Sequence, residues 1–253
     1  MTKSPGELWG AADYERIAKR FAAIQDGLVE ALALTPGERV LDVATGTGEV
    51  ALRASRLGAR VRALDIAPAL LEQAQAKAAR ERLPIEWMEG NAEQLPYEDG
   101  SFDVVCSNFG VIFAEIESAA AELARVCRAG GRLGLTAWKP NEGLRRIYAA
   151  FDKRGEDDPA QRWGDEECLE KVFGGLFDLR CEERIWTLTG DSPEDVWELI
   201  TAAAPPVKAF VEKLDPARLA EFRSTMLDYW RGFEAGGAVA EPRAYLLVLG
   251  RRR

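Results

Sequence analysis

The sequence predicts an α/β fold built around a doubly wound, mainly parallel sheet. Short apolar runs rich in β-branched residues alternate with helical patterns through about the first 140 of the 253 residues. A glycine-containing turn follows the first of these runs. Strand–helix alternation at this spacing implies right-handed βαβ units, which place parallel strands side by side in one sheet.

Seven segments have the pattern of strands, and helices are predicted between them. The predicted strands are 39–44, 60–65, 84–90, 101–109, 131–138, 177–190 and 243–250. The predicted helices are 49–58, 68–83, 116–131, 141–155, 165–175, 192–204 and 215–235. Gly58 ends the first helix and Pro68 opens the second, positions that suit each residue's backbone. Ser192 and Asp215 are typical N-caps, and the proline pair at 205–206 ends a helix.

We expect one domain over residues 1–253, with a helical cap at 1–34 and a helical insert at 191–240 before the last strand. One face of the last predicted helix is apolar at helical spacing. It consists of Leu219, Phe222, Met226, Trp230 and Phe233. The insert is therefore a candidate lid over a ligand site. The alternative is that its aromatic side chains only pack on the core.

Charge and apolar content restrict the partners. The net charge of −9 and the pI of about 4.9 disfavour nucleic acid and anionic membranes as partners. The basic run at 251–253 is predicted to be a solvated tail. We predict no membrane span, a cytoplasmic location and reduced thiols for the four cysteines, which are far apart in sequence. A monomer and a homodimer both remain open.

The chain contains no histidine. A histidine-based triad, a histidine proton shuttle and a histidine-rich metal site are therefore excluded. Any general base must be Asp, Glu, Tyr, Lys, Cys or water. We predict no metal site and assign no catalytic residue.

The turn after the first strand is compatible with two cofactors. Residues 46–51 read Gly-Thr-Gly-Glu-Val-Ala, which satisfies the GxGxxA pattern of dinucleotide-binding proteins. Asp65 ends the second strand, where such proteins keep an acidic residue for ribose hydroxyls. Both a nicotinamide-dependent oxidoreductase and a methyl-transfer enzyme need close backbone approach and a carboxylate for a ribose. The pattern alone is a weak signal.

Asp42 favours the second alternative. It lies four residues before Gly46, where its carboxylate would repel a pyrophosphate. The methionine end of S-adenosylmethionine carries an ammonium and a sulfonium, which suit a carboxylate better. Asn91 and Glu93 also follow the third strand, where polar side chains could border an adenine ring.

Four successive motifs resemble those of class I S-adenosylmethionine-dependent methyltransferases, in particular the small-molecule branch of the ubiquinone/menaquinone-biosynthesis type (methyltransferase type 11). The motifs are VLDVATGTGEVA, ALDIAPALLEQAQAKA, EGNAEQLPYEDGSFDVVCSNFGVIF and ELARVCRAGGRLGLTAW. The resemblance covers roughly residues 35–140. It implies a Rossmann-like seven-stranded sheet in the order 3-2-1-4-5-7-6 with the last strand antiparallel. Ala44 departs from the family by replacing the first glycine of the turn, although a small residue still permits close approach.

The resemblance also implies a site for S-adenosylmethionine, with S-adenosylhomocysteine as the product. The residues that would hold the amino-acid part are Asp42, Ala44, Thr45, Gly46 and Gly48. Asp65 would bind the ribose hydroxyls, and the adenine would lie against Ile66, Asn91 and Ala92. Asn108, Phe109 and Gly110 would face the methionine moiety and the acceptor. In the N-terminal segment, Trp9, Tyr14 and Arg20 could contact the methionine carboxylate or the acceptor.

We therefore expect methyl transfer to a small-molecule acceptor by in-line displacement. Because the donor is already activated, the protein mainly aligns the reactants and excludes water. Trp and Phe side chains in the insert suggest an aromatic or otherwise apolar acceptor. The alternatives are an NAD(P)-dependent oxidoreductase and a non-catalytic S-adenosylmethionine-binding protein.

Overall fold

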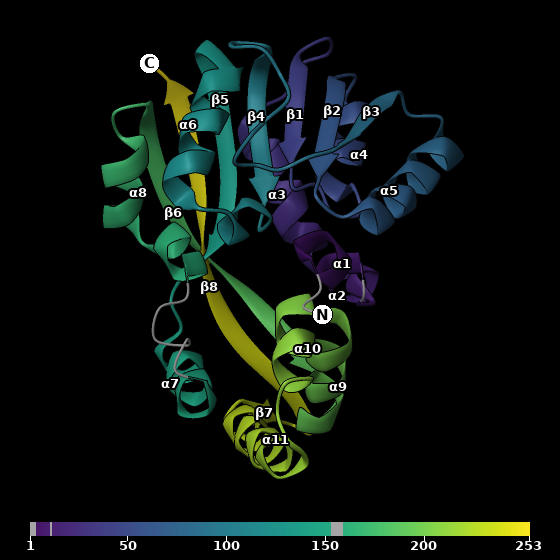
Figure 1. The fold of residues 1–253 in the computed structure, drawn as a ribbon, viewed down its shortest axis with the longest axis vertical. Helices are drawn as coiled ribbons and strands as arrows, with labels where there is room; N and C mark the ends of the chain where they lie inside the picture. The colour runs from purple at the N-terminus through teal and green to yellow at the C-terminus, as the bar shows by residue number, and fades with distance from the viewer. Residues whose placement is uncertain (1–3, 11, 153–158) are drawn as a thin grey trace. The chain divides into compact units, whose positions relative to one another are not determined.

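The computed structural model describes residues 4–10, 12–152 and 159–253. They form two compact units, and each unit draws on several stretches of the chain. Unit 1 comprises 1–20, 140–158 and 185–244, whereas unit 2 comprises 21–139, 159–184 and 245–253. Two of the boundaries between the units fall inside long strands, β6 (Phe177–Gly190) and β8 (Ala238–Arg252), which are labelled in Figure 1.

The sheet has the order β3-β2-β1-β4-β5-β8-β6. Its other strands are β1 (Arg39–Val43), β2 (Arg60–Asp65), β3 (Ile85–Glu89), β4 (Phe102–Asn108) and β5 (Cys127–Trp138). The first five strands in this order pair in parallel, and β8 pairs antiparallel with β5. The predicted strand order is confirmed. The difference is an eighth strand, β7 (Glu234–Ala235), which forms a short antiparallel pair with the start of β8.

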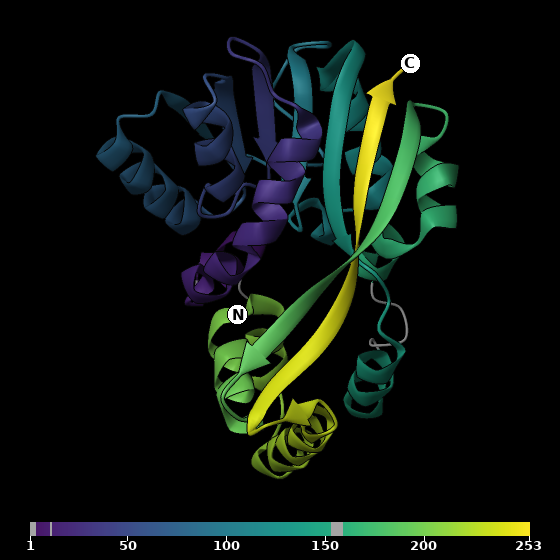
Figure 2. The same cartoon turned by 180° about the vertical axis from the view of Figure 1, so that it is seen from behind.

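Helices cover both faces of the sheet in unit 2. They are α3 (Ala22–Leu32), α4 (Glu49–Arg56), α5 (Pro68–Glu81), α6 (Ile116–Val126) and α8 (Glu166–Phe173), with short 3-10 helices η1 (Lys19–Phe21), η2 (Val111–Phe113) and η4 (Pro159–Gly164) beside them or at their ends. Figure 1 shows α6 in front of the sheet, and the reverse view in Figure 2 brings α3 to the front. Buried residues of α3, α4, β1, β2 and β4 form one core cluster. The alternation of strands and helices thus buries both faces of the parallel strands.

The predicted helix at 116–131 is shorter than expected. α6 ends at Val126, and β5 begins at Cys127 instead of residue 131. Gly130 has a φ of +67°, and the pairing between β4 and β5 shifts register at this point. A side chain at Gly131 would lie only 2.6 Å from the sulfur of Cys127. The glycine pair therefore forms an irregularity inside β5 and does not cap the helix.

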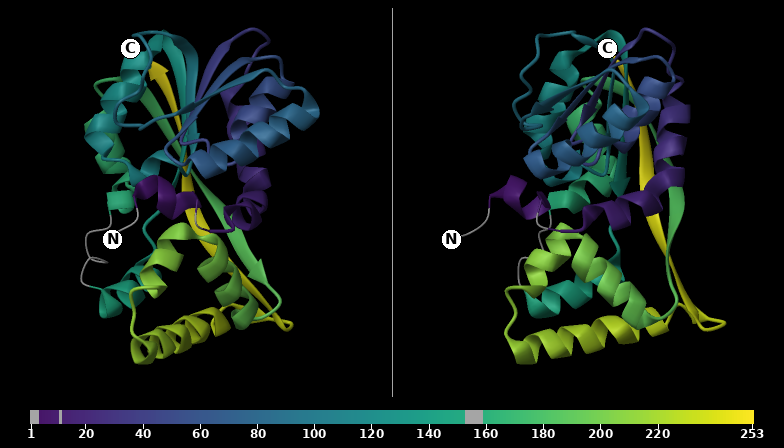
Figure 3. Two further views of the ribbon diagram at one scale, coloured as in Figure 1. Left: turned by 45° about the vertical axis from the view of Figure 1, so that its right-hand side comes forward. Right: turned by 90° about the vertical axis from the view of Figure 1, so that its right-hand side faces the viewer.

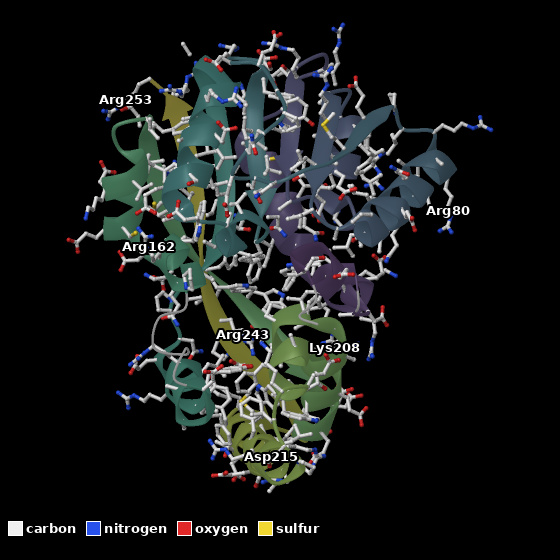
Figure 4. The ribbon with its side chains drawn as sticks, viewed as in Figure 1. Arg80, Arg162, Lys208, Asp215, Arg243 and Arg253 are labelled. Atoms are coloured by element: carbon white, nitrogen blue, oxygen red, sulfur yellow. The ribbon has the colours of Figure 1, made fainter. Side chains whose placement is uncertain are left out.

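The basic run at the end of the sequence is not a solvated tail. Arg251 and Arg252 lie in β8, and Arg252 is half-buried. Its guanidinium donates to the carbonyl oxygens of Ala124 and Leu176, both at 2.9 Å. Arg253, labelled in Figure 4, forms an ion pair with Asp178 at 2.7 Å. The prediction failed because carbonyl partners more than 70 residues away cannot be read from a short basic run.

Unit 1 contains mainly helices. They are α1 (Pro5–Gly10), α2 (Tyr14–Ala18), α7 (Glu142–Phe151), α9 (Pro193–Ala203), α10 (Pro205–Val211) and α11 (Pro216–Arg231). Figure 3 shows α9, α10 and α11 following one another between the ends of β6 and β8. Residues 153–155 of the predicted helix at 141–155 lie outside the described residues. No helix in the described part of the chain is long and apolar enough to cross a bilayer.

Local capping determines where the unit 1 helices begin. The Ser192 hydroxyl accepts from the backbone N–H of Asp195 at 3.1 Å, as its N-cap position predicts. The Asp215 carboxylate accepts from the backbone N–H groups of Ala217 and Arg218 in the first turn of α11. The proline pair ends α9 as expected, but a further helix, α10, begins at Pro205 because proline fits the first helical turn.

An aromatic core centred on Phe222 holds these helices together. Phe222 is fully buried, and its ring lies 4.9–5.8 Å from four other rings. They belong to Tyr148, Phe151, Trp197 and Phe210. Met226 and Trp230 of the predicted apolar face are buried as well, and Leu219 and Phe233 are half-buried.

We predict that Phe222→Ala lowers the free energy of unfolding by about 3–5 kcal/mol, because it removes a buried ring and leaves a cavity. Urea denaturation followed by tryptophan fluorescence measures the effect. The matched control is Phe113→Ala, since the Phe113 side chain is 48% exposed and its loss should change stability little. Equal stability losses in the two variants would contradict a core role for Phe222.

Candidate active site

The turn between β1 and α4 is the structural centre of the candidate site. Ala44, Gly46 and Gly48 have φ values of +53°, +56° and +82°. A side chain at Gly48 would lie 2.7 Å from the Trp87 ring and 2.9 Å from the Cβ of Ala74. Gly48 is therefore needed both for its backbone conformation and for the close approach of the turn to β3 and α5.

Ala44 stands where the methyltransferases that the motifs resemble usually have a glycine, and its φ of +53° gives a physical reason to favour glycine at this position. A left-handed backbone costs a residue with a Cβ about 1–2 kcal/mol, whereas glycine adopts it freely. Ala44 also faces the segment after β4, where a side chain at Gly110 would lie 2.4 Å from the Ala44 oxygen. The two segments touch through their backbones, which leaves room only for the smallest residues.

Asp42, at the end of β1, holds this turn from inside. Its side chain is buried, and one carboxylate oxygen accepts from the Thr45 hydroxyl at 2.5 Å and from the Ala51 N–H at 3.0 Å. Burial raises the pKa of Asp42 to about 7, and the negative charge of Asp65 acts in the same direction.

Asp65, at the end of β2, holds the same turn from the neighbouring strand. Its carboxylate accepts from the Gly46 N–H at 2.7 Å and from the Ala67 N–H at 2.9 Å. Burial raises the pKa of Asp65, although these hydrogen bonds oppose the shift. Two carboxylates from adjacent parallel strands are thus brought together around one glycine turn.

Asn91 and Ala92 follow β3, next to Asp65. The Gly90 N–H donates to the Asp65 carbonyl oxygen at 3.0 Å, which joins the ends of β2 and β3. Asn91 is exposed, and its side-chain oxygen accepts from the Glu93 N–H at 3.0 Å. Ala92 is buried, whereas Ile66 exposes 36% of its surface. An apolar side chain and a small residue therefore flank the ends of these strands.

Asn108 is the last residue of β4, and Phe109 and Gly110 follow it. Phe109 has a φ of +55°, an uncommon backbone for a bulky residue. The Thr136 hydroxyl accepts from the Phe109 N–H at 3.0 Å and donates to the Asn108 side-chain oxygen at 2.9 Å. The Phe109 ring stacks on Trp138 with centroids 4.0 Å apart and nearly parallel planes. Thr136 and Trp138 thus hold a strained segment in place.

The stacked pair is part of a larger aromatic cluster in unit 2. Phe21 lies 5.5 Å from Phe109, and Tyr245 lies 5.8 Å from it. Burial raises the pKa of Tyr245, so its hydroxyl stays protonated at neutral pH. The cluster is an apolar wall beside the glycine turn, built from η1, the residue that follows β4, and the strands β5 and β8.

Tyr14 lies in α2, which belongs to unit 1, whereas the glycine turn belongs to unit 2. Its ring packs edge-on against Trp9, with centroids 5.7 Å apart. Arg20 also belongs to unit 1, where it donates to the Thr189 carbonyl oxygen at 2.5 Å. The roles assigned to these N-terminal residues remain predictions.

The structure places two residues at the site, Thr47 and Lys77, to which no role was assigned from the sequence. Thr47 is buried, and its hydroxyl has no hydrogen-bond partner among the described residues. The Lys77 ammonium bonds Glu49 at 2.8 Å and the Thr47 carbonyl oxygen at 3.3 Å, which secures the start of α4. A Thr inside a glycine turn was a visible signal, whereas the Lys77 contact depends on the packing of α5. No cluster of Cys, Asp and Glu in the described ranges is placed to hold a metal ion.

The comparisons with known proteins agree with this geometry. Residues 41–135 match the family described as a methyltransferase domain. The resemblance of this region to class I S-adenosylmethionine-dependent methyltransferases is therefore confirmed.

Two curated relatives extend the match. An uncharacterized protein of Mycobacterium tuberculosis is 38% identical over 174 residues, which is 66% of this chain and 64% of the relative. A demethylmenaquinone methyltransferase of Deinococcus radiodurans is 44% identical over 114 residues, which is 44% of this chain and 47% of that protein. The chain thus matches less than two thirds of the length of these relatives.

A solved structure shows that the likeness in fold extends further along the chain. The YcgJ protein from Bacillus subtilis superposes with a TM-score of 0.65 at 20% identity, covering 90% of this chain and 97% of the other. At this identity, the comparison supports the fold alone.

We predict that Gly110→Ala disrupts the turn, because its new Cβ would overlap the Ala44 backbone oxygen. The free energy of unfolding should fall by roughly 1–3 kcal/mol, the usual cost of overpacking. The control is Ala44→Gly, which removes a strained Cβ and should leave stability equal or higher. If Gly110→Ala cost no stability when introduced into the Ala44→Gly variant, the overlap with the backbone oxygen would be contradicted.

We also predict that Asp42 makes stability depend on pH. Its pKa is about 7 in the folded protein and about 4 in an unfolded chain, so the folded state binds one more proton between these values. The free energy of unfolding should therefore fall as pH rises from about 4 to about 7. Asp42→Asn should flatten this slope while keeping an oxygen acceptor for Thr45 and Ala51. Urea denaturation at pH 5, 6 and 7 measures the free energy of unfolding of both proteins. If it changes with pH equally in the wild type and in Asp42→Asn, Asp42 does not titrate in this range.

Proposed function

We propose that this protein transfers a methyl group from S-adenosylmethionine to a small-molecule acceptor. The observation that carries the proposal is the placement of two buried carboxylates, Asp42 and Asp65, around one glycine turn at the ends of adjacent parallel strands. Open α/β sheets bind ligands at the carboxyl ends of their parallel strands, which is where these two carboxylates lie. A cationic ligand would offset the cost of burying two negative charges there.

The residues present fit the cofactor. The turn at 44–48 allows close approach to the amino-acid part, and the buried Thr47 hydroxyl is a polar atom still lacking a partner among the described residues. The Asp65 carboxylate can accept from two ribose hydroxyls, since each carboxylate oxygen has a second acceptor position. The exposed Ile66 side chain would cover one face of the adenine, and Asn91 and Ala92 would border its edge.

The roles of the protein are binding, alignment and exclusion of water. When bound, S-adenosylmethionine supplies a methyl group activated by a positively charged sulfur. Asn108, Phe109 and Gly110 would orient the methionine moiety against the acceptor. Because Thr136 and Trp138 fix the backbone of Phe109, this alignment would require little reorganisation on binding.

The aromatic cluster around Phe109 supports an aromatic or otherwise apolar acceptor. The available bases restrict its chemistry further. Burial raises the pKa of Tyr97, Tyr148, Tyr229 and Tyr245, so these phenols remain protonated near neutral pH. Because the chain has no histidine and these phenols stay protonated, we expect an acceptor whose nucleophilic atom needs little or no deprotonation by the protein. An acidic hydroxyl, an enolate carbon or a neutral amine would meet this condition. The lid function of the 191–240 helices remains a prediction.

Calorimetry with S-adenosylhomocysteine tests the cofactor assignment. We expect saturable binding by the wild type and a roughly 100-fold weaker Kd for Asp65→Ala, which loses two charge-assisted contacts. Asp178→Ala is the matched control, because the Asp178 carboxylate is exposed on β6. Binding of NADH without binding of S-adenosylhomocysteine would instead support an oxidoreductase. Mass spectrometry of an acceptor panel then separates an enzyme from a protein that only binds the cofactor.

A further inference from the structure

The segment between β3 and β4 contains no helix over residues 90–101. It carries Asn91 and Ala92, which we assign to the adenine, and continues through Leu95 and Tyr97. In a segment without its own helical or strand ladder, the buried backbone groups need hydrogen-bond partners within the loop, in other elements or in water. The position of the adenine edge therefore depends on whatever holds this loop.

Two side chains of α6 hold the loop between β3 and β4 in place. The Arg125 guanidinium donates to the carbonyl oxygens of Leu95 at 2.9 Å and Tyr97 at 2.6 Å. The Glu122 carboxylate accepts from the Leu95 N–H at 2.7 Å. Both backbone groups of Leu95 are thus bonded to one face of α6, and the Leu95 side chain is buried.

The two side chains also fix each other. Glu122 accepts from the Arg125 Nε at 2.6 Å and from its Nη2 at 2.7 Å, and Asp99 accepts from its Nη1 at 2.9 Å. This planar fork positions the remaining N–H groups toward the loop, an arrangement that a lysine cannot reproduce. A further contact joins the loop to the start of α6, where the Glu93 carboxylate accepts from the Glu115 N–H at 2.9 Å.

We infer that Arg125 and Glu122 are positioning residues that set the place of the adenine-binding edge from α6, through the backbone of residues 95–97. The inference rests on the proposed function. Neither side chain needs to touch the ligand, since the fork acts on the loop that carries Asn91 and Ala92. A purely structural role would affect stability without affecting affinity for the adenosine part.

The test compares two ligands in three variants. For Arg125→Gln we expect the Kd values for S-adenosylhomocysteine and for 5′-methylthioadenosine to rise by the same factor, about tenfold. The factor should be equal because both ligands contain the adenosine part, and the loop is proposed to contact only this part. Arg125→Lys should fall between this variant and the wild type. Arg56→Gln is the matched control, since it removes a two-point arginine–carboxylate pair with Glu81 that involves no residue of the 90–101 segment.

Hydrogen exchange of the loop provides a second readout that needs no ligand. Arg125→Gln should speed exchange over residues 93–99 while peptides from the core of α6 stay protected. The inference would be overturned if Arg125→Gln bound both ligands with the Kd values of the wild type, or if its hydrogen exchange over residues 93–99 were unchanged. If the wild type binds neither ligand, the proposed function fails, and hydrogen exchange still decides whether Arg125 positions the loop. Should Arg125→Gln not fold, Glu122→Gln serves in both measurements.

Discussion

The arrangement of this site depends on two carboxylates buried side by side at the ends of adjacent parallel strands. Burying a charge is costly unless hydrogen bonds or an opposite charge compensate it. The turn supplies part of that compensation through the Thr45 hydroxyl and the backbone N–H groups of Gly46 and Ala51. Burial raises the pKa of Asp42, and the negative charge of Asp65 adds to this shift, so the compensation is incomplete. A cationic ligand would supply the remaining compensation.

Backbone strain accompanies this electrostatic cost. Ala44 and Phe109 both adopt positive φ without being glycine, and they flank the point where Gly110 meets the turn. Strained residues persist only where their surroundings determine them strongly, and such residues tend to cluster at functional sites. Here the Thr136 hydroxyl and the Trp138 ring provide that support. The tight contact between the ends of β1 and β4 thus shapes both the cofactor turn and the apolar wall next to it.

The loop after β3 is likewise held in place by residues of another element. Its residues make few regular hydrogen bonds of their own, and the guanidinium of Arg125 substitutes for the missing ladder. In the proposed function, the residues that would touch the cofactor lie at strand ends and in turns. The residues that hold them, among them Thr136, Trp138 and Arg125, come from the next strand and helix along the chain.

The sequence by itself determined seven of the strands, most helices and the turn that joins Asp42 to α4, because these features follow from periodicity and from motifs only a few residues long. The strand order was predicted from the resemblance to a known family. Only the tertiary structure decided that β5 begins at Cys127, that Arg252 is part of a strand and that Phe109 stacks on Trp138. It also decided that Arg125 holds a loop 28–30 residues away. Each of these depends on partners distant in sequence, whose proximity is created by the pairing and packing of the sheet.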